Sequence, residues 1–177
     1  MRGNLKLNID DCSKGDSSQA GYGELLRDET GTWLWCYNDK LGHCTSLKVE
    51  IWTIYRGLTI LFQKEVTNVE LETDSEQAMH QIQHGPHPNS SLKTLIEYVK
   101  FLLQRCYCSL LYTLREGNKV ADRLTNLGVA QHEHAMILED PPTKVTALLI
   151  DNMTGVSVER DLSFGCSSEL IFLLCLL

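Results

Sequence analysis

The sequence predicts an α/β domain built on a mixed sheet of about five strands that is flanked by helices. Near the N-terminus, apolar and polar residues alternate, which is typical of half-buried strands. From Thr45 onward, apolar residues recur every three or four positions, which indicates helices that face a core. An antiparallel hairpin followed by crossover helices implies a sheet that contains both antiparallel and parallel pairs.

The first three strands form the antiparallel part of the predicted sheet. Residues 5–10 alternate between aliphatic and polar side chains, and this strand is predicted to end at Asp10. Two further strands, 22–27 and 32–37, flank a turn over 28–31 whose last residue is glycine. A glycine at the fourth position suits a tight turn, so these strands are predicted to pair as a hairpin.

The remaining elements follow from changes of period and from capping residues. A break is expected over 85–89, where Gly and Pro cluster. The predicted elements are a main helix from Thr45 that carries Leu47, Ile51, Ile54, Leu58 and Leu61, a strand over 69–73, a helix that follows the N-cap-like pair Asp74-Ser75 and runs to about His84, a helix through Leu92, Leu95, Ile96, Val99 and Leu102, a strand over 106–114, and a helix capped by Asn118 that runs through Leu127.

Length and composition indicate one folded domain with a tail. The chain has 177 residues, of which 22% are charged and 43% are hydrophobic, as in ordinary globular proteins. The net charge of -7 argues against a uniformly basic surface for nucleic acid, although an acidic protein can still bind phosphate through metal ions. The seven cysteines lack the spacing of a zinc site and are expected to be reduced, mostly buried thiols.

Four carboxylates occupy positions that suit a shared site. Glu50 lies within the apolar stripe of the main helix, where an unpaired carboxylate is costly to bury. Asp10 and Asp74 each end a predicted strand, and each occupies the same place in its strand's alternation of aliphatic and polar residues. Their side chains would therefore emerge on one face of the sheet if those strands are neighbours. Asp122, near the start of the last helix, can supply a fourth ligand.

Each carboxylate also has a simpler interpretation. Asp10 could begin a polar turn, and Asp74 could cap a helix. Asp122 could form an ion pair with a neighbouring basic side chain, and the Glu50 side chain could extend to the edge of its helix. Taken together, the four favour a metal site, because carboxylate-only clusters select hard cations such as Mg²⁺ or Mn²⁺. Two such ions would activate water and clamp a phosphodiester, so phosphodiester hydrolysis is the expected chemistry.

Aromatic and basic residues give weaker indications. The aromatic residues of the hairpin and main helix are expected to lie in the core rather than to stack on bases; they are Trp33, Trp35, Trp52 and Tyr55. The scattered basic residues are either ordinary surface charge or contacts to a nucleic-acid backbone; they are Lys14, Lys40, Lys48, Arg115, Lys119 and Arg123.

Several of these segments together resemble the type-1 ribonuclease H family, especially its plant retroelement-derived, reverse transcriptase-like branch. The resemblance runs from about Asn4 to Val158 and rests on Leu7-Asn8-Ile9-Asp10, Ala20-Gly21-Tyr22-Gly23, Leu26-Arg27-Asp28, Glu50-Ile51-Trp52, Leu71-Glu72-Thr73-Asp74-Ser75, Arg115-Glu116-Gly117-Asn118-Lys119-Val120-Ala121-Asp122, Asp140-Pro141-Pro142 and Leu148-Leu149. It implies a ribonuclease H-like fold and a metal-dependent endoribonuclease that cuts the RNA strand of RNA/DNA hybrids. It also implies that Asp10, Glu50, Asp74 and Asp122 are the catalytic metal ligands, with two Mg²⁺ or Mn²⁺ ions as cofactors.

The sequence departs from this family at a few positions. After the first aspartate the family has Gly and a small residue, whereas this chain has Asp11-Cys12. A carboxylate there adds bulk and repulsion toward a phosphate, which favours an alternative: a catalytically degenerate domain with only a structural or weak nucleic-acid-binding role. No catalytic histidine is identified, and His132 and His134 are expected to face solvent.

The resemblance also divides the chain into parts. We expect a ribonuclease H-like domain over 4–131, a family-like extension over 132–158 and an unassigned apolar tail over 159–177. The apolar end, 170–177, is too short to span a bilayer, and residues 1–10 do not read as a secretory signal. An intracellular monomer in cytoplasm or nucleus is therefore expected, with nucleic acid as its partner and no membrane or protein partner.

Overall fold

The computed structural model describes residues 5–14, 19–115, 118–130 and 136–154. In chain order, its elements are β1 (Leu5–Lys14), β2 (Gln19–Arg27), β3 (Trp33–Gly42), α1 (Ser46–Gln63), β4 (Val69–Thr73), α2 (Glu76–His84), α3 (Lys93–Arg105), β5 (Ser109–Tyr112), α4 (Lys119–Ala130), β6 (Met136–Leu138) and α5 (Thr143–Thr154). None of the helices in these ranges combines the length and apolarity needed to cross a membrane.

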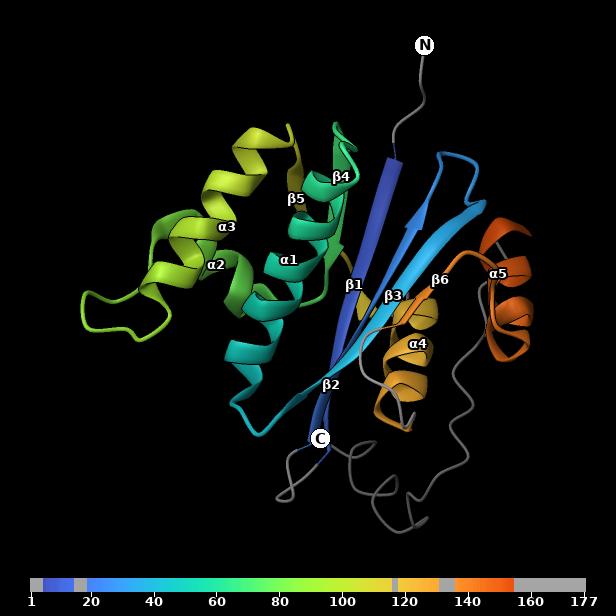
Figure 1. Ribbon diagram of the computed structural model, residues 1–177, viewed down its shortest axis with the longest axis horizontal. Coiled ribbons are helices and arrows are strands. Elements are labelled where there is room, and N and C mark those ends of the chain that lie inside the picture. Colours follow the sequence, from blue (N-terminus) through green and yellow to red (C-terminus); the bar gives the residue numbers. More distant parts are fainter. Residues whose placement is uncertain (1–4, 15–18, 116–117, 131–135, 155–177) are drawn as a thin grey trace, which may run out of the picture.

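The strands form one mixed sheet in the order β5-β4-β1-β2-β3-β6. The pairs β1–β2, β2–β3 and β3–β6 are antiparallel, whereas β1–β4 and β4–β5 are parallel. Figure 1 shows α1, α2 and α3 on one side of this sheet and α4 and α5 on the other. The predicted mixed α/β sheet is therefore confirmed, with β6 as a sixth strand that the sequence prediction did not include.

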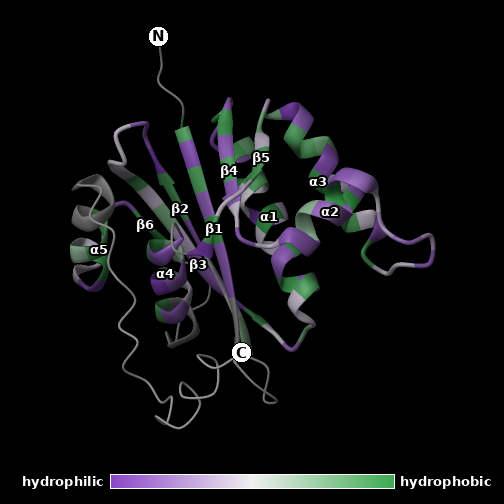
Figure 2. Cartoon of the chain, turned by 180° about the vertical axis from the view of Figure 1, so that it is seen from behind, coloured by the Kyte–Doolittle hydropathy of each residue, from purple (hydrophilic) through white to green (hydrophobic). Residues whose placement is uncertain are grey.

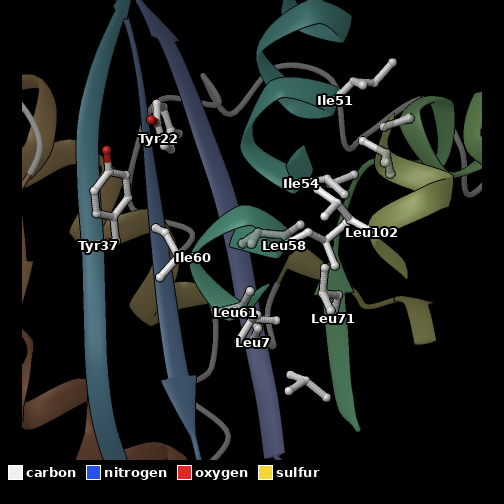
Figure 3. Close-up of a cluster of buried hydrophobic side chains, with 14 of the residues drawn as sticks. Leu7, Tyr22, Tyr37, Ile51, Ile54, Leu58, Ile60, Leu61, Leu71 and Leu102 are labelled. Carbon is white, nitrogen blue, oxygen red and sulfur yellow. The ribbon is translucent and has the colours of Figure 1, made fainter. Parts of the chain in front are cut away.

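Alternation along the strands divides the core into two layers. Figure 2 shows hydrophobic and hydrophilic bands alternating along β1 and β4. Leu7 and Ile9 pack with the apolar stripe of α1 in the larger of two clusters. Figure 3 shows side chains of this cluster, among them Leu7, Leu58 and Leu102. On the opposite face, Leu25 and Cys36 pack against α4 and α5 in a smaller cluster. The sheet is thus buried on both faces around β1, β2 and β3.

Aromatic and sulfur-containing side chains follow the expected burial. Trp35 is buried, and Trp33, Trp52 and Tyr55 are partly buried against the two clusters. Cys36 and Cys106 are free and buried, and Cys44 and Cys108 are free and partly buried.

Several features differ from the sequence prediction, and β2 and β3 extend beyond the predicted 22–27 and 32–37. β1 does not end at Asp10 but continues to Lys14, because β2 pairs with it along this whole length. The predicted strand over 106–114 shrinks to Ser109–Tyr112, since Cys106 ends α3 and Tyr107 has a positive φ of 53°. The fold beyond the predicted last helix includes α5, whose Val145 and Leu149 join the smaller cluster.

A missing side chain on β2 lets α4 approach the sheet closely. Gly23 is the β2 partner of Asp10, and a Cβ at Gly23 would lie 2.7 Å from the backbone nitrogen of Thr125 in α4. A larger residue would therefore push α4 away from β1 and β2. This contact fixes where α4 presents its first turn.

One carboxyl lies inside the larger core. Glu24 of β2 is fully buried beside α1, and a Cβ at Gly57 would lie 3.2 Å from its Oε2. Neither carboxylate oxygen of Glu24 has a hydrogen-bond partner among the described residues. Burial raises the pKa of Glu24 well above its usual 4.5, and the charge of Arg56 opposes this shift. Glu24 therefore keeps its proton to higher pH in the folded state than in the unfolded chain.

Glu24→Gln should make the protein less sensitive to rising pH. The unfolded chain releases the Glu24 proton near the ordinary pKa, whereas the folded state holds it to higher pH, so stability falls as pH rises between these values. The neutral amide removes this loss, so the variant should exceed the wild type in melting temperature at about pH 8 and by less at about pH 5. Melting followed by circular dichroism measures both, with exposed Glu97→Gln as a control that should show no such change. Equal pH dependence in Glu24→Gln and wild type would contradict the assignment.

Candidate active site

A shallow pocket forms where β1 extends past its neighbour β4. The parallel pairing of these strands stops at Asn8 and Glu72, and β4 ends at Thr73, whereas β1 continues to Lys14. Beyond this point only β2 still pairs with β1, so one edge of β1 is open. The pocket at this edge is lined by Ile9, Asp10, Asp11, Glu50, Thr53, Thr73 and Asp74.

Asp10 and Asp74 lie beside each other in this pocket. The parallel pairing of β1 and β4 ends at Asn8 and Glu72, two residues before each of them, and Asp74 is the strongest charged neighbour of Asp10. Because both follow the polar parity of their strands, their carboxylates face the same side. Asp10 is only 8% exposed, and its Oδ2 has no hydrogen-bond partner among the described residues. The predicted juxtaposition of these two residues is present.

Glu50 reaches the pocket from α1 and is held there by the cap of α2. Ser75 is the N-cap of α2, as predicted, and its hydroxyl accepts a hydrogen bond from Ala78 N–H. The same hydroxyl donates to Glu50 Oε2 at 2.6 Å, while Ser46 donates to Oε1 at 3.3 Å. The capping serine thus fixes the orientation of the α1 carboxylate.

A basic residue from the segment before α4 neutralises part of this charge. The Arg115 guanidinium donates from Nε to Asp74 Oδ2 at 3.1 Å. The Arg115 side chain is 86% exposed, whereas that of Asp74 is 12% exposed. Because an exposed ion pair contributes little stability, another cation could take the place of the Arg115 guanidinium on Asp74 at little cost in free energy.

The first turn of α4 is anchored to β1 beside the pocket. Asn118 Nδ2 donates to the carbonyl of Ile9 at 2.8 Å, and the Thr125 hydroxyl donates toward the carbonyl of Asp10 at 3.1 Å. Asn118 lies at the predicted N-cap position, where its carbonyl accepts from Asp122 N–H, but its side chain does not cap the helix, because its amide joins the helix to β1 and its Oδ1 has no partner among the described residues. Asp122 is exposed and does not line the pocket.

Crowding of carboxylates shifts the protonation of two of them. Burial, followed by the charges of Asp74, Asp122 and Asp11, raises the pKa of Asp10 to about 8. Burial, followed by the charges of Glu50 and Asp74, raises the pKa of Asp11 to about 7. The charge of Arg115 lowers both values. The pocket therefore carries more negative charge than its own side chains compensate.

The pocket fits a divalent cation in the kind of its ligands and in their charge. Its titratable lining is entirely carboxylate, and the buried, unpartnered Oδ2 of Asp10 needs a positive partner. As they stand, no three acidic, histidine or cysteine side chains of the described residues converge on one point. Glu50 is turned to Ser75 and Asp74 to Arg115, so an ion must compete with these partners.

Three participants in this site were not assigned to it from the sequence. Asp11 was recognised only as a departure from the family pattern, Ser75 only as a helix cap, and Arg115 only as one of several scattered bases. Their contacts join segments far apart in the chain, such as Arg115 with Asp74, and no local pattern reports such contacts. His132 and His134 lie outside the described residues.

The arrangement of the strands and helices is similar to solved ribonuclease H structures. Ribonuclease H1 of the archaeon Halobacterium salinarum superposes with a TM-score of 0.65 at 22% identity, covering 72% of this chain and 98% of that one. LC11 ribonuclease H1, solved in complex with an RNA/DNA hybrid, gives 0.64 at 23% identity, covering 72% and 97%. The predicted ribonuclease H-like fold is thereby confirmed.

Sequence comparison decides the family. The model of the reverse transcriptase-like family matches residues 8–128, which is more than half of the chain and includes the whole pocket. The chain belongs to the reverse transcriptase-like family. A candidate ribonuclease H protein of Arabidopsis thaliana is 30% identical over 161 residues, which cover 88% of this chain and 25% of that protein. The chain thus spans about a quarter of the length of this curated relative.

Asp10→Asn should stabilise this reverse transcriptase-like domain in the absence of divalent cations. Because the pKa of Asp10 is raised to about 8, the folded protein must either bury this charge beside Asp74 and Asp11 or take up a proton at neutral pH, and an uncharged amide of the same size removes that cost. We expect a gain of about 1–2 kcal/mol in the free energy of unfolding, measured by urea denaturation at neutral pH with a chelator present. Asp122→Asn, at an exposed carboxylate, should gain less. A loss of stability in Asp10→Asn would show that the Asp10 carboxylate is not strained.

Proposed function

We propose that the domain is a metal-dependent endoribonuclease that hydrolyses the RNA strand of RNA/DNA hybrids. The observation that carries this proposal is that Asp10, Asp11, Glu50 and Asp74 all line one pocket at the open edge of β1. The likeness of the fold to ribonucleases H, one of them solved with an RNA/DNA hybrid, supports the choice of reaction and substrate. Nucleic acid is accordingly the proposed partner of a monomeric domain.

Asp10, Glu50, Asp74 and Asp122 are the proposed metal ligands, with Mg²⁺ or Mn²⁺ as the cofactor and two ions as the expected number. Bound there, such ions supply Lewis-acid chemistry for an in-line displacement at phosphorus. Asp10 offers its unpartnered Oδ2 from the centre of the sheet, and Asp122 offers an exposed carboxylate from α4. Glu50 and Asp74 become available when they exchange their bonds to Ser75 and Arg115.

The protein groups around these ligands have positioning roles in this proposal. Ser75 orients Glu50, while Asn118 and Thr125 hold the first turns of α4 against β1 and so keep Asp122 near Asp10. Arg115, once displaced from Asp74, is an exposed cation beside the pocket and suits contact with a phosphate of the substrate. Recognition of the RNA strand would then rest on its 2′-hydroxyls, since DNA lacks them.

A second candidate function is a non-catalytic domain that keeps the fold and binds nucleic acid weakly. The observation that favours it is the Asp11 carboxylate, which lines the pocket and would repel an approaching phosphate unless a cation neutralises it. In that case the four proposed ligands would be remnants, and substitution of Asp10 would leave nucleic-acid affinity almost unchanged.

Cleavage of a labelled RNA/DNA hybrid distinguishes the two candidates. The wild type should cut the RNA strand with Mg²⁺ or Mn²⁺, and Asp10→Asn or Glu50→Gln should reduce the rate by roughly a hundredfold or more because each removes a metal ligand. Glu97→Gln, on the exposed face of α3, should cut like the wild type. Duplexes of DNA alone and of RNA alone serve as substrate controls. Absence of cutting by a folded, metal-saturated wild type would eliminate the nuclease and leave the binding domain.

A further inference from the structure

Asp11 lies on the opposite face of β1 from Asp10, yet both residues line the same pocket. Successive strand residues normally serve different layers, and here Ile9 and Asp11 share the α1 face while Asp10 shares the α4 face. Both can reach one pocket because β4 no longer covers this edge of β1. The pocket therefore reaches both sides of the sheet, and Asp11 lines it on the α1 side, as Glu50 does.

The charges that face Asp11 define what this extension can bind. Glu50 of α1 is the strongest charged neighbour of Asp11, and Asp74 follows. The charge of Arg115 partly compensates Asp11, but its guanidinium is bonded to Asp74 rather than to Asp11. Two neighbouring carboxylates, half-buried on the same side of β1, repel each other unless a cation lies between them.

A second observation points to a cation in the same pocket. Asp10 is 92% buried, as its 8% exposure implies, and its Oδ2 has no protein partner among the described residues. A buried carboxylate oxygen without a donor requires a positive ligand or a proton. The pocket thus contains the unpartnered Oδ2 of Asp10 on the α4 side of β1, and the carboxylates of Asp11 and Glu50 on the α1 side.

We propose that Asp11 is an additional carboxylate ligand of the divalent cation site, sharing a cation with Glu50. This inference rests on the proposed function, because it concerns the same site, and it adds a ligand to the four proposed above. The additional carboxylate favours cations that accept many protein oxygens. Mg²⁺ keeps several waters and takes only one or two carboxylates, whereas Mn²⁺ binds the same oxygen ligands with higher affinity. The domain therefore prefers Mn²⁺ over Mg²⁺, and Asp11 determines that preference.

Titration of the metal-free full chain with Mn²⁺, followed by electron paramagnetic resonance of the free ion, tests this directly. Asp11→Gly restores the residue of the family pattern, and Asp11→Asn keeps the volume and removes the charge. Both variants should bind Mn²⁺ about tenfold more weakly than the wild type. Competition with Mg²⁺ should show a smaller change, so that the preference for Mn²⁺ decreases. Glu29→Gln, at an exposed carboxylate of the β2–β3 turn, is the matched control and should bind like the wild type.

Equal or tighter Mn²⁺ binding in both Asp11 variants would overturn the inference, because Asp11 would then only repel its neighbours. Circular dichroism of each variant confirms that the comparison is made on folded protein. This failure is distinct from failure of the proposed function, in which the wild type binds Mn²⁺ but does not cut the hybrid. The reverse pattern, cutting by a wild type whose Mn²⁺ affinity is unaffected by Asp11→Asn, would keep the nuclease and remove Asp11 from its ligands.

Discussion

The unequal reach of two parallel neighbours, β1 and β4, organises the candidate site. Pairing between them stops at Asn8 and Glu72. Beyond this point β1 continues to Lys14 and is paired only with β2. An open strand edge inside a helix-covered sheet is unusual, because unpaired backbone groups need other partners. Asn118, which precedes α4, and Thr125 of α4 donate to the carbonyls of Ile9 and Asp10. These contacts place α4 beside the carboxylates.

The position of α4 depends in turn on a small residue in β2. Gly23 faces Thr125 so closely that a Cβ would lie within 2.8 Å of its hydroxyl oxygen. The Thr125 hydroxyl is the group that reaches the carbonyl of Asp10, the residue paired with Gly23. Packing and site geometry are thus linked through one cross-strand pair, and substitutions far from the carboxylates can displace them.

Much of this architecture could be predicted from local sequence patterns, whereas the features that depend on contacts between distant segments could not. The parity of Asp10 and Asp74 and the place of Glu50 in an apolar stripe were readable because strand and helix periods fix which side chains share a face. The short β6 was not, since three residues show no reliable period. Ser75 was predicted as a cap, but its bond to Glu50 spans 25 positions of the chain. Likewise, the ion pair of Arg115 with Asp74 depends on how the segment before α4 is placed against the end of β4, which no local pattern shows.

Charge balance explains why such a site opposes the stability of its own fold. Asp10, Asp11, Glu50 and Asp74 share one pocket, and their partners among the described residues include the exposed guanidinium of Arg115 and the hydroxyls of Ser46 and Ser75. Ligands bound only by the folded state stabilise it, so cations that neutralise this pocket must strengthen the fold as they bind. Asp11 increases both the repulsion without a cation and the attraction with one. A residue that weakens the metal-free protein is therefore consistent with a selected role, because strained, destabilising groups persist where function requires them.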